Sequence, residues 1–327
     1  MCSVNKTELT DELRNVHAGC SLTIAVLGTL GNAMSVSLIC KARLYKASPI
    51  MMLILDLCVS NALSTTIILP IITATSIYRQ WVFGKVFCKA FGYLMYVTLM
   101  AECLILTNLT VCQYLTIVHQ VSIKAFTLNR HTHLRLFALV GLPWVIAILV
   151  FLVPLTDTWD TFGYEYKTGY CSLIKVDRGI GFKTILAFAV ICIMTAVTFY
   201  CYSAILIIYM KSRRRIQQGH QSQAPKFQGY TKKILLMISA ILINYIVTYL
   251  PFLVSSTVDP CRGHTSLPVH TVMIYVSWSH SAINPVIYAL LNRKIKVLWC
   301  NTLHSLPSIS RFTSKNTSDE RRGTEPG

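Results

Sequence analysis

Two ionisable side chains, Glu102 and His280, lie in the middle of long apolar stretches of this sequence. Burying an ionisable group there is costly, so its presence indicates a function. Such a group can bind a cation, pair with an opposite charge, or act as a neutral hydrogen-bonding residue. The sequence has no Gly-rich phosphate loop, no paired-histidine metal motif and no nucleophile elbow, and we therefore expect that the protein is not an enzyme.

Seven apolar stretches must position these residues. Each is long enough for a helix to cross the ~30 Å hydrocarbon core of a bilayer, which takes ~20 residues. They run over residues 18–40, 49–78, 91–118, 136–156, 184–210, 234–258 and 263–292. Hydrophobic residues make up 54% of the chain and charged residues 13%, against about 25% charged in a soluble domain. The sequence predicts an all-α membrane protein, a seven-transmembrane helix bundle without a separate soluble domain.

Lysine and arginine set the orientation of the bundle. The loops after the first, third and fifth stretches are basic, and the longest of them, residues 211–233, contains no acid. By the positive-inside rule these loops are cytoplasmic, so we expect a multi-pass plasma-membrane protein with its N-terminus outside and its C-terminus inside. The net charge of +17 then indicates topology and attraction to anionic inner-leaflet lipid rather than nucleic-acid binding.

The chain divides into four predicted parts: an extracellular N-terminus (1–17), the seven-helix domain (18–292), an amphipathic helix (293–303) and a cytoplasmic tail (304–327). Ile295, Leu298 and Trp299 share one face of the short helix, which is flanked by basic residues, a pattern suited to the membrane interface. Asn5 begins an Asn-Lys-Thr glycosylation motif outside the membrane. Cys300 is either palmitoylated or an unmodified cysteine.

Two cysteines, Cys88 and Cys171, lie on the predicted outer side, where a disulfide can persist. We expect them to be bonded to each other. Cys2, Cys20 and Cys261 are also outside and could form one further bridge. The cysteines within the apolar stretches are expected to stay reduced and to pack as small apolar side chains.

A set of residues distributed along the chain resembles a known family in order and spacing. The set comprises Gly31-Asn32, Trp81 with Phe83-Gly84 before Cys88, Trp144, Tyr202, Pro251 and Asn284-Pro285-Val286-Ile287-Tyr288. On these residues the chain resembles the rhodopsin-like (class A) G-protein-coupled receptors over nearly its whole length. Leu69-Pro70, Ile77-Tyr78-Arg79-Gln80-Trp81 and Thr248-Tyr249-Leu250-Pro251-Phe252 are similar to the melatonin-like and Moody-like branch.

The resemblance implies that an outside ligand moves the inner half of the sixth span, opening a cleft for a heterotrimeric G protein. Pro251 and Pro285 would kink their helices and provide pivots, and Tyr202 and Tyr288 occupy positions of the family's activation residues. The activation motifs diverge, because Cys112-Gln113-Tyr114 stands where the family usually has Asp-Arg-Tyr. Gln113 has no charge, so the usual ionic lock cannot form and efficient coupling is in question.

A second divergence concerns the polar centre of the bundle. The family usually has aspartate at the position of Asn61 and a small polar residue at the position of Glu102, so the acid has moved to a neighbouring helix. The resemblance places six polar residues together: Asn32, Asn61, Glu102, His280, Ser281 and Asn284. Glu102 could then bind sodium, pair with protonated His280, or act as a neutral hydrogen-bonding acid.

The outer bundle is the expected ligand pocket. Its predicted lining is apolar and aromatic and comprises Phe91, Met95, Tyr96, Leu99, Tyr249, Phe252, Ile274, Tyr275 and Trp278, which favours a neutral, indole-like or lipid-like ligand. Met95 stands where amine receptors have their aspartate, and Trp278 where opsins have their Schiff-base lysine, so neither amine nor retinal fits. Two functions remain open: a ligand-gated activator of G proteins, or a poorly coupling decoy or adhesion receptor.

Overall fold

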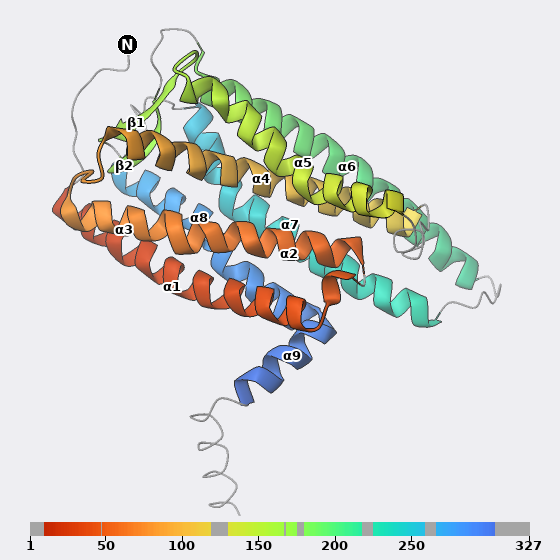
Figure 1. Cartoon of the computed structure of the whole chain (residues 1–327). Helices are drawn as coiled ribbons and strands as arrows, with labels where there is room; N and C mark the ends of the chain where they lie inside the picture. Colours follow the sequence, from red (N-terminus) through yellow and green to blue (C-terminus); the bar gives the residue numbers. More distant parts are fainter. Residues whose placement is uncertain are drawn as a thin grey trace, which may run out of the picture.

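The computed structural model describes residues 10–46, 48–118, 130–166, 168–174, 180–217, 225–258 and 266–304. Its helices pack side by side into one elongated bundle, with a two-stranded hairpin at one end and a short helix leaving the other (Figure 1). We call these the outer and inner ends. Asn5 and the predicted tail beyond His304 lie outside the described residues, and so do Cys2 and Cys261.

The helices follow the apolar stretches and extend beyond several of them. Their bounds are α1 Asp11–Lys41, α2 Pro49–Leu63, α3 Leu69–Tyr78, α4 Lys85–Val118, α5 Arg130–Leu155, α6 Phe182–Gln217, α7 Pro225–Val258, α8 Leu267–Leu291 and α9 Arg293–His304. A 3-10 turn, η1 (Leu44–Lys46), precedes α2, and a π-helical segment, η2 (Ser64–Ile68), joins α2 to α3. The strands are β1 Thr161–Glu165 and β2 Tyr170–Ile174, paired antiparallel.

The first helix begins earlier than predicted. The sequence predicts an extracellular segment up to residue 17, whereas α1 starts at Asp11, with the Thr10 hydroxyl accepting from the Leu13 N–H at its cap. Polar contacts hold the added turns against neighbouring helices. Arg14 donates to the carbonyl of Arg79, and His17 contacts the Tyr275 hydroxyl at 2.8 Å. Hydropathy alone misses this extension because the residues that anchor it are polar.

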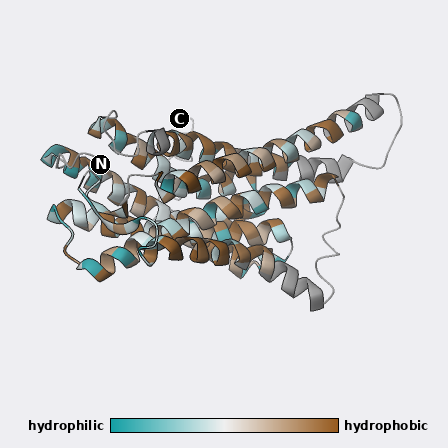
Figure 2. Ribbon diagram, turned by 90° about the horizontal axis from the view of Figure 1, so that it is seen from above, coloured by the Kyte–Doolittle hydropathy of each residue, from teal (hydrophilic) through white to brown (hydrophobic). Residues whose placement is uncertain are grey.

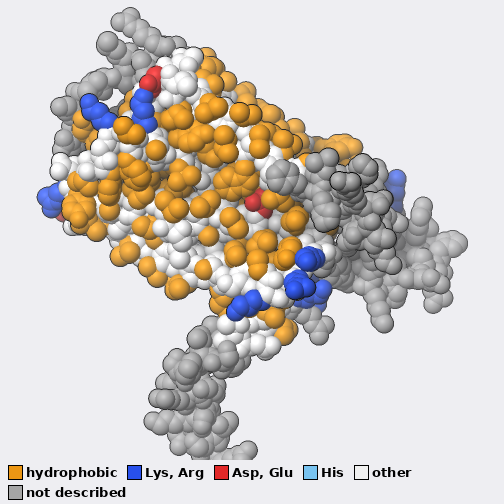
Figure 3. All heavy atoms as spheres, in the orientation of Figure 1, with side chains coloured by type: hydrophobic (Ala, Val, Ile, Leu, Met, Phe, Trp, Pro, Cys, Tyr) orange, Lys and Arg blue, Asp and Glu red, His pale blue; other side chains and the backbone are white. Residues whose placement is uncertain are grey.

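The surface of the bundle is suited to a bilayer. Brown, hydrophobic residues run along the middle of the helices in Figure 2, and Figure 3 shows apolar side chains covering the visible face of the bundle while the blue basic side chains gather near its ends. Exposed members include Leu30, Phe199 and Val247. Six helical stretches among the described residues are long and apolar enough to cross a membrane, with α2 to α3 counted as one. The remaining long helix, α8, has two histidines and several serines.

Close helix contacts hold the inner half together. A side chain at Gly31 of α1 would meet the Cβ of Pro285 in α8 at 2.9 Å, so this approach requires glycine. Pro285 has no N–H to donate to the carbonyl of Ser281 four residues earlier. The side chain of Asn32 supplies the missing donor at 2.8 Å. The predicted Gly-Asn pair in α1 therefore accommodates the proline of α8.

Candidate functional site

The outer end is covered by the β1–β2 hairpin, which a disulfide attaches to α4. Cys88 in the first turn of α4 is bonded to Cys171 in β2, with their Cα atoms 5.4 Å apart, as predicted. Lys89 also donates to the Oδ2 atom of Asp157 at 2.5 Å. This hydrogen bond, together with one from Thr161, lowers the pKa of Asp157. The start of α4 thus holds both the hairpin and the segment that leads into it.

A pocket opens beneath the hairpin, with about 930 Å³ of empty space when the part open to solvent is counted. Residues of α4, α5, α6, α7, α8 and β2 line it. Six of the predicted ligand residues are on its wall: Met95, Tyr96, Leu99, Tyr249, Phe252 and Trp278. The others on the wall include Met100, Cys103, Phe151, Tyr170, Ser172, Lys183, Leu186, Ala187, Val190 and Ser277.

Three predicted ligand residues are buried near the pocket but do not line it. Phe91, Ile274 and Tyr275 belong to the apolar cluster of the outer end. Phe91 packs against Trp81 with 5.4 Å between ring centroids, and the Tyr275 hydroxyl contacts His17. These three side chains are therefore not among those that line the pocket, although they belong to the same apolar cluster as several residues that do.

Lys183 and Ser172 add a charged group and a hydroxyl to the pocket that were not predicted. Lys183 of α6 is half-buried on the wall, and its Nζ lies 5.9 Å from the centre of the Tyr96 ring. The hydroxyls of Tyr96 and Ser172 are 3.1 Å apart. Strand β2 brings Ser172 into the site. A short strand within a loop gives no hydropathy signal, so Ser172 could not be assigned from the sequence.

Aromatic rings lead from the pocket floor to the centre of the bundle. Tyr249 on the wall packs against Tyr245 with 5.1 Å between centroids, and Tyr245 packs edge-on against His280, also at 5.1 Å. The Tyr245 hydroxyl contacts the sulfur of Cys103 at 2.8 Å. Tyr249, Tyr245 and His280 are therefore packed in one continuous series, so displacing the Tyr249 ring would disturb the packing of the other two side chains.

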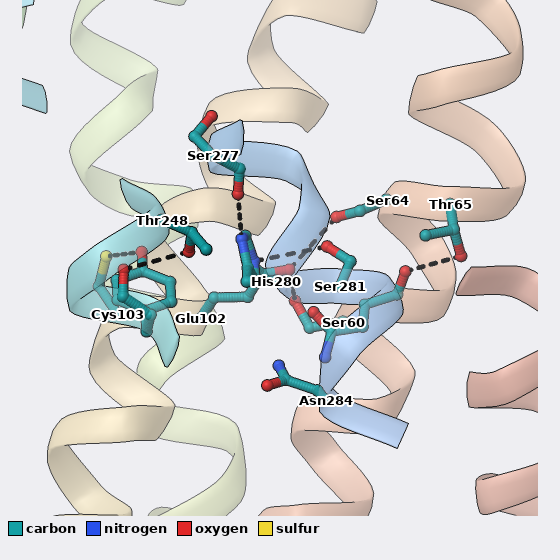
Figure 4. Close-up of polar contacts among 12 residues, drawn as sticks. Ser60, Ser64, Thr65, Glu102, Cys103, Thr248, Ser277, His280, Ser281 and Asn284 are labelled. Atoms are coloured by element: carbon teal, nitrogen blue, oxygen red, sulfur yellow. Dashed lines mark hydrogen bonds and ion pairs between the residues drawn. The ribbon is translucent and has the colours of Figure 1, made fainter. Parts of the chain in front are cut away.

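Glu102 and His280 form the centre of this network, as Figure 4 shows. Both are fully buried, and Glu102 Oε2 lies 3.1 Å from His280 Nε2. Glu102 Oε1 accepts hydrogen bonds from Ser60 and Ser64 at 3.1 and 3.2 Å. His280 Nδ1 contacts the backbone carbonyl of Ser277. Every polar atom of the two side chains consequently has a partner among the described residues.

This geometry limits the protonation of the pair. A carbonyl oxygen only accepts, so His280 Nδ1 must carry a proton. The contact between Nε2 and Oε2 then needs one proton of its own, held either by the imidazole or by the carboxyl group. An ionised Glu102 facing an unprotonated Nε2 would bring two lone pairs together. The structure therefore favours one shared proton between the two residues.

The other four predicted centre residues are only partly brought together. Ser281 Oγ lies 3.4 Å from His280 Nε2, and Asn32 bonds to the Ser281 carbonyl. Asn284 instead accepts from Asn244 of α7, a residue that the sequence analysis did not single out. The side-chain amide of Asn61 is fully buried and has no partner among the described residues. The polar centre thus consists of a Glu102–His280 site and a separate Asn244–Asn284 contact.

A second polar contact joins three helices near the inner end. The Tyr202 hydroxyl of α6 donates to Gln113 Oε1 of α4 at 3.3 Å, and Ser239 Oγ of α7 donates to Tyr202 at 3.3 Å. Gln113 is fully buried, and its amide nitrogen has no partner among the described residues. Where an ionic contact is usual, this chain has an uncharged bridge. Cys112 and Tyr288 are also buried. The hydroxyl of Tyr114 instead contacts that of Tyr200 on the outside of α6.

Comparison with known proteins places this geometry in a family. The model of the "7 transmembrane receptor (rhodopsin family)" matches residues 31–288, well over half of the chain. The chain belongs to the rhodopsin family of seven-transmembrane receptors. Members of this family are signalling receptors embedded in membranes and are not enzymes.

Several relatives are recognisable at low identity. The chain is 24% identical to protein trapped in endoderm-1 of Drosophila melanogaster, covering 90% of this chain and 81% of that protein. It is 21% identical to the G-protein coupled receptor moody of the same organism, covering 96% of this chain and 56% of that one. Rat somatostatin receptor type 1 is 24% identical, with 84% of this chain and 68% of the relative covered. The predicted Moody-like placement of the receptor is confirmed.

The fold agrees with that of an experimentally determined receptor. The crystal structure of squid rhodopsin superposes with a TM-score of 0.75 at 15% identity, covering 98% of this chain and 88% of that one. At this identity the likeness concerns the fold alone. It confirms the predicted seven-helix bundle, including α8, which hydropathy left out of the membrane-spanning set.

One interior contact of the receptor was not foreseen. Asp56 of α2 is buried and accepts a hydrogen bond from the Trp144 indole at 3.0 Å. The contact links α2 to α5. The hydropathy of the run around Asp56 does not reveal which face of the helix this residue occupies.

Proposed function

We propose that the protein is a plasma-membrane receptor, with its N-terminus outside, that binds a small extracellular ligand in the outer pocket. Binding shifts α7 and is transmitted to heterotrimeric G proteins at the inner end. The observation that carries this proposal is the packed series Tyr249, Tyr245 and His280, which connects the pocket wall to the polar centre. Tyr249 stands two residues before Pro251, where α7 lacks a backbone donor.

The proposed signal is a population shift between two packings of the bundle. A ligand can act only through its difference in affinity for the two packings. Contact with Tyr249 supplies such a difference, because moving this ring alters the packing of Tyr245 against His280. At the inner end, movement of α7 away from α6 must break the contact between Ser239 and Tyr202. A neutral hydrogen bond of this kind contributes about 1 kcal/mol, so the closed packing is held weakly there.

The residues of α9 support the part of this proposal that concerns the membrane. Lys294 and Lys296 are exposed on α9, while Ile295 is fully buried. We propose that the exposed lysines attract anionic inner-leaflet lipid. Cys300 is exposed on the same helix and remains a candidate for palmitoylation. Glycosylation at Asn5 also stays a proposal.

A poorly coupling decoy or adhesion receptor is the second candidate function. It is favoured by the burial of Gln113, which offers a G protein neither charge nor an exposed donor. An arginine presents five donors and a permanent charge, and glutamine cannot replace it in a charged contact. The same position therefore decides between the two candidates.

The test is the replacement Gln113→Arg, alone and combined with Cys112→Asp. An arginine fits poorly in the closed packing because its charge would be buried, so it should favour the open packing and raise basal G-protein activation several-fold. G-protein dissociation would be measured in cells at equal surface levels of receptor. Gln113→Met is the matched control, because it removes the bridge to Tyr202 without adding a charge.

Three outcomes separate the candidates. Activation by wild-type receptor above that of empty cells supports a coupling receptor. Activation only after Gln113→Arg, and not after Gln113→Met, supports a seven-span receptor that has lost coupling. No activation by any variant would contradict the coupling function and leave the decoy function.

A further inference from the structure

Lys183 gives the outer pocket a chemical preference that its apolar wall does not. It is the only charged residue on a wall otherwise made of aromatic, aliphatic, sulfur-containing and hydroxyl side chains, within the described residues. Acidic residues do not contribute to the described wall. Asp160, which precedes strand β1, accepts from the Phe182 N–H at 2.7 Å and so caps α6.

The lysine points into the bundle rather than towards lipid. A lysine near a helix end commonly extends along the membrane surface to reach headgroups. Here Nζ lies near the ring of Tyr96, a residue of α4 that lines the pocket and whose hydroxyl contacts Ser172. The ammonium group is therefore available to a molecule in the pocket, with the Tyr96 and Ser172 hydroxyls in the same part of the wall.

The wall below the lysine is apolar. Leu186, Ala187 and Val190 follow Lys183 along α6, facing Leu99 and Met100 of α4 across the pocket. Seven residues separate Lys183 from Val190, which corresponds to roughly 10 Å at the helical rise of 1.5 Å per residue. The pocket thus combines one cation at its outer end with an apolar channel of that length.

We propose that the ligand is an anionic amphiphile, with a carboxylate or phosphate head on Lys183 and an apolar tail of roughly 10 Å along α6. A single positive charge in a partly dry site favours an acid head over a neutral one, because a charge-assisted hydrogen bond is about twice as strong as a neutral one. This inference rests on the proposed ligand-binding function and replaces the neutral ligand expected from the sequence.

The experiment measures binding separately from signalling. Purified receptor in nanodiscs of zwitterionic lipid would be unfolded thermally with a thiol-reactive dye, since the free cysteines Cys58 and Cys201 are buried in the folded protein and away from the pocket wall. The exposed free cysteines Cys40, Cys192 and Cys300 would first be replaced by serine, so that labelling reports unfolding. The probes are alkyl carboxylates and alkyl phosphates of graded tail length, with the matching alcohols and trimethylammonium compounds. Stabilisation at increasing probe concentration gives the apparent affinity.

The acids should stabilise the receptor more than the alcohols, and the ammonium compounds least. Lys183→Gln should weaken acid binding roughly tenfold to a hundredfold, since a hydrogen bond to a charged group contributes about 1.5–3 kcal/mol. Alcohol binding should stay unchanged, and Lys183→Arg should retain most of the affinity for acids. Lys85→Gln is the matched control, because Lys85 is exposed at the start of α4 and does not line the pocket.

Filling the channel with Ala187→Trp should abolish binding of every probe and so locate the site. Carboxylates and phosphates are compared directly, which distinguishes a fatty-acid-like from a lysophospholipid-like head. The inference is overturned if Lys183→Gln leaves acid affinity unchanged, if alcohols bind as tightly as acids, or if no acid binds. Acid binding without G-protein activation would instead contradict only the proposed coupling function.

Discussion

Replacing Glu102 by glutamine should leave the receptor nearly as stable as the wild type, whereas replacing it by leucine should not. Glutamine keeps an oxygen that can accept from Ser60 and Ser64, and its amide N–H can donate to His280 Nε2. The three contacts of Glu102 are then all retained with His280 in the tautomer that its bond to Ser277 requires. If one proton is shared between the two residues, glutamine supplies it permanently.

Leucine removes all three contacts. The two serine hydroxyls can turn to carbonyl groups of their own helix, so most of the loss falls on His280, whose Nε2 is left buried and unpaired. A buried polar group without a partner costs about 1–3 kcal/mol. With a smaller contribution from the serines, we expect Glu102→Leu to cost roughly 2–4 kcal/mol, which corresponds to a loss of several degrees in Tm.

Thermal unfolding of solubilised receptor, followed by dye labelling of its buried cysteines, measures the difference. Ser279→Ala is the matched control, because Ser279 is a half-buried serine of the same helix as His280 whose hydroxyl, within the described part of the chain, donates to the carbonyl of Val276 and not to the Glu102–His280 site. Each receptor is measured in sodium buffer and again with sodium replaced by a bulky organic cation. The shared-proton geometry leaves Oε2 occupied by His280, so we expect no dependence on sodium.

A bound sodium ion would give the opposite pattern. Glu102→Gln would then be nearly as unstable as Glu102→Leu, and the wild type would lose stability and gain agonist affinity when sodium is withdrawn. That result would refute the shared-proton interpretation. Repeating the agonist titration at two pH values with His280→Gln shows whether the pair exchanges a proton with water during activation, since only a dependence that this variant removes belongs to His280.

Two further predictions concern contacts that link helices. Cys88→Ala should abolish surface expression or ligand response. Removal of a disulfide commonly costs about 2–5 kcal/mol, and this disulfide fixes β2 over the pocket. Normal surface labelling and a normal response of the variant would contradict this prediction. Asp56→Asn should be tolerated, since its oxygen can still accept from Trp144. Asp56→Leu should lower the Tm, because it leaves the N–H of the half-buried indole unpaired, which costs about 1 kcal/mol. Equal Tm values for the two variants would contradict the importance of this bond.

The bundle could be predicted from the sequence because each of its helices is recorded as a long apolar run or as a spaced motif. Asn284-Pro285 identified α8 even though its histidines and serines lower its hydropathy. The start of α1 could not be found in this way. Arg14 and His17 are polar, and their contacts with Arg79 and Tyr275 come from parts of the chain that are distant in sequence.

The pocket shows the same limit at the level of single side chains. The motif positions assigned residues to the right helices and depth, and six of nine reached the wall. Phe91, Ile274 and Tyr275 lie on the same helices but turn to packing partners, which helical position alone does not determine. Lys183 was missed because it stands at the edge of an apolar stretch, where a basic residue is ordinarily a topology signal.

The positions at which this chain departs from the family's usual residues are far apart in the sequence but are linked by contacts in the structure. His280 partners Glu102 and also packs against Tyr245, which itself contacts the pocket residue Tyr249. Glu102 on α4 therefore lies on the route between the proposed ligand and the inner end. An acid at position 61 would not lie on this route, because the side-chain amide of Asn61 makes no contact among the described residues. At the inner end, position 113 carries an uncharged glutamine. Gln113 is linked to α7 through Tyr202 by hydrogen bonds between neutral groups. Because such bonds are weaker than an ion pair in a dry interior, we expect the inner contact to restrain α7 less and the Glu102–His280 site to have the larger part in the proposed activation.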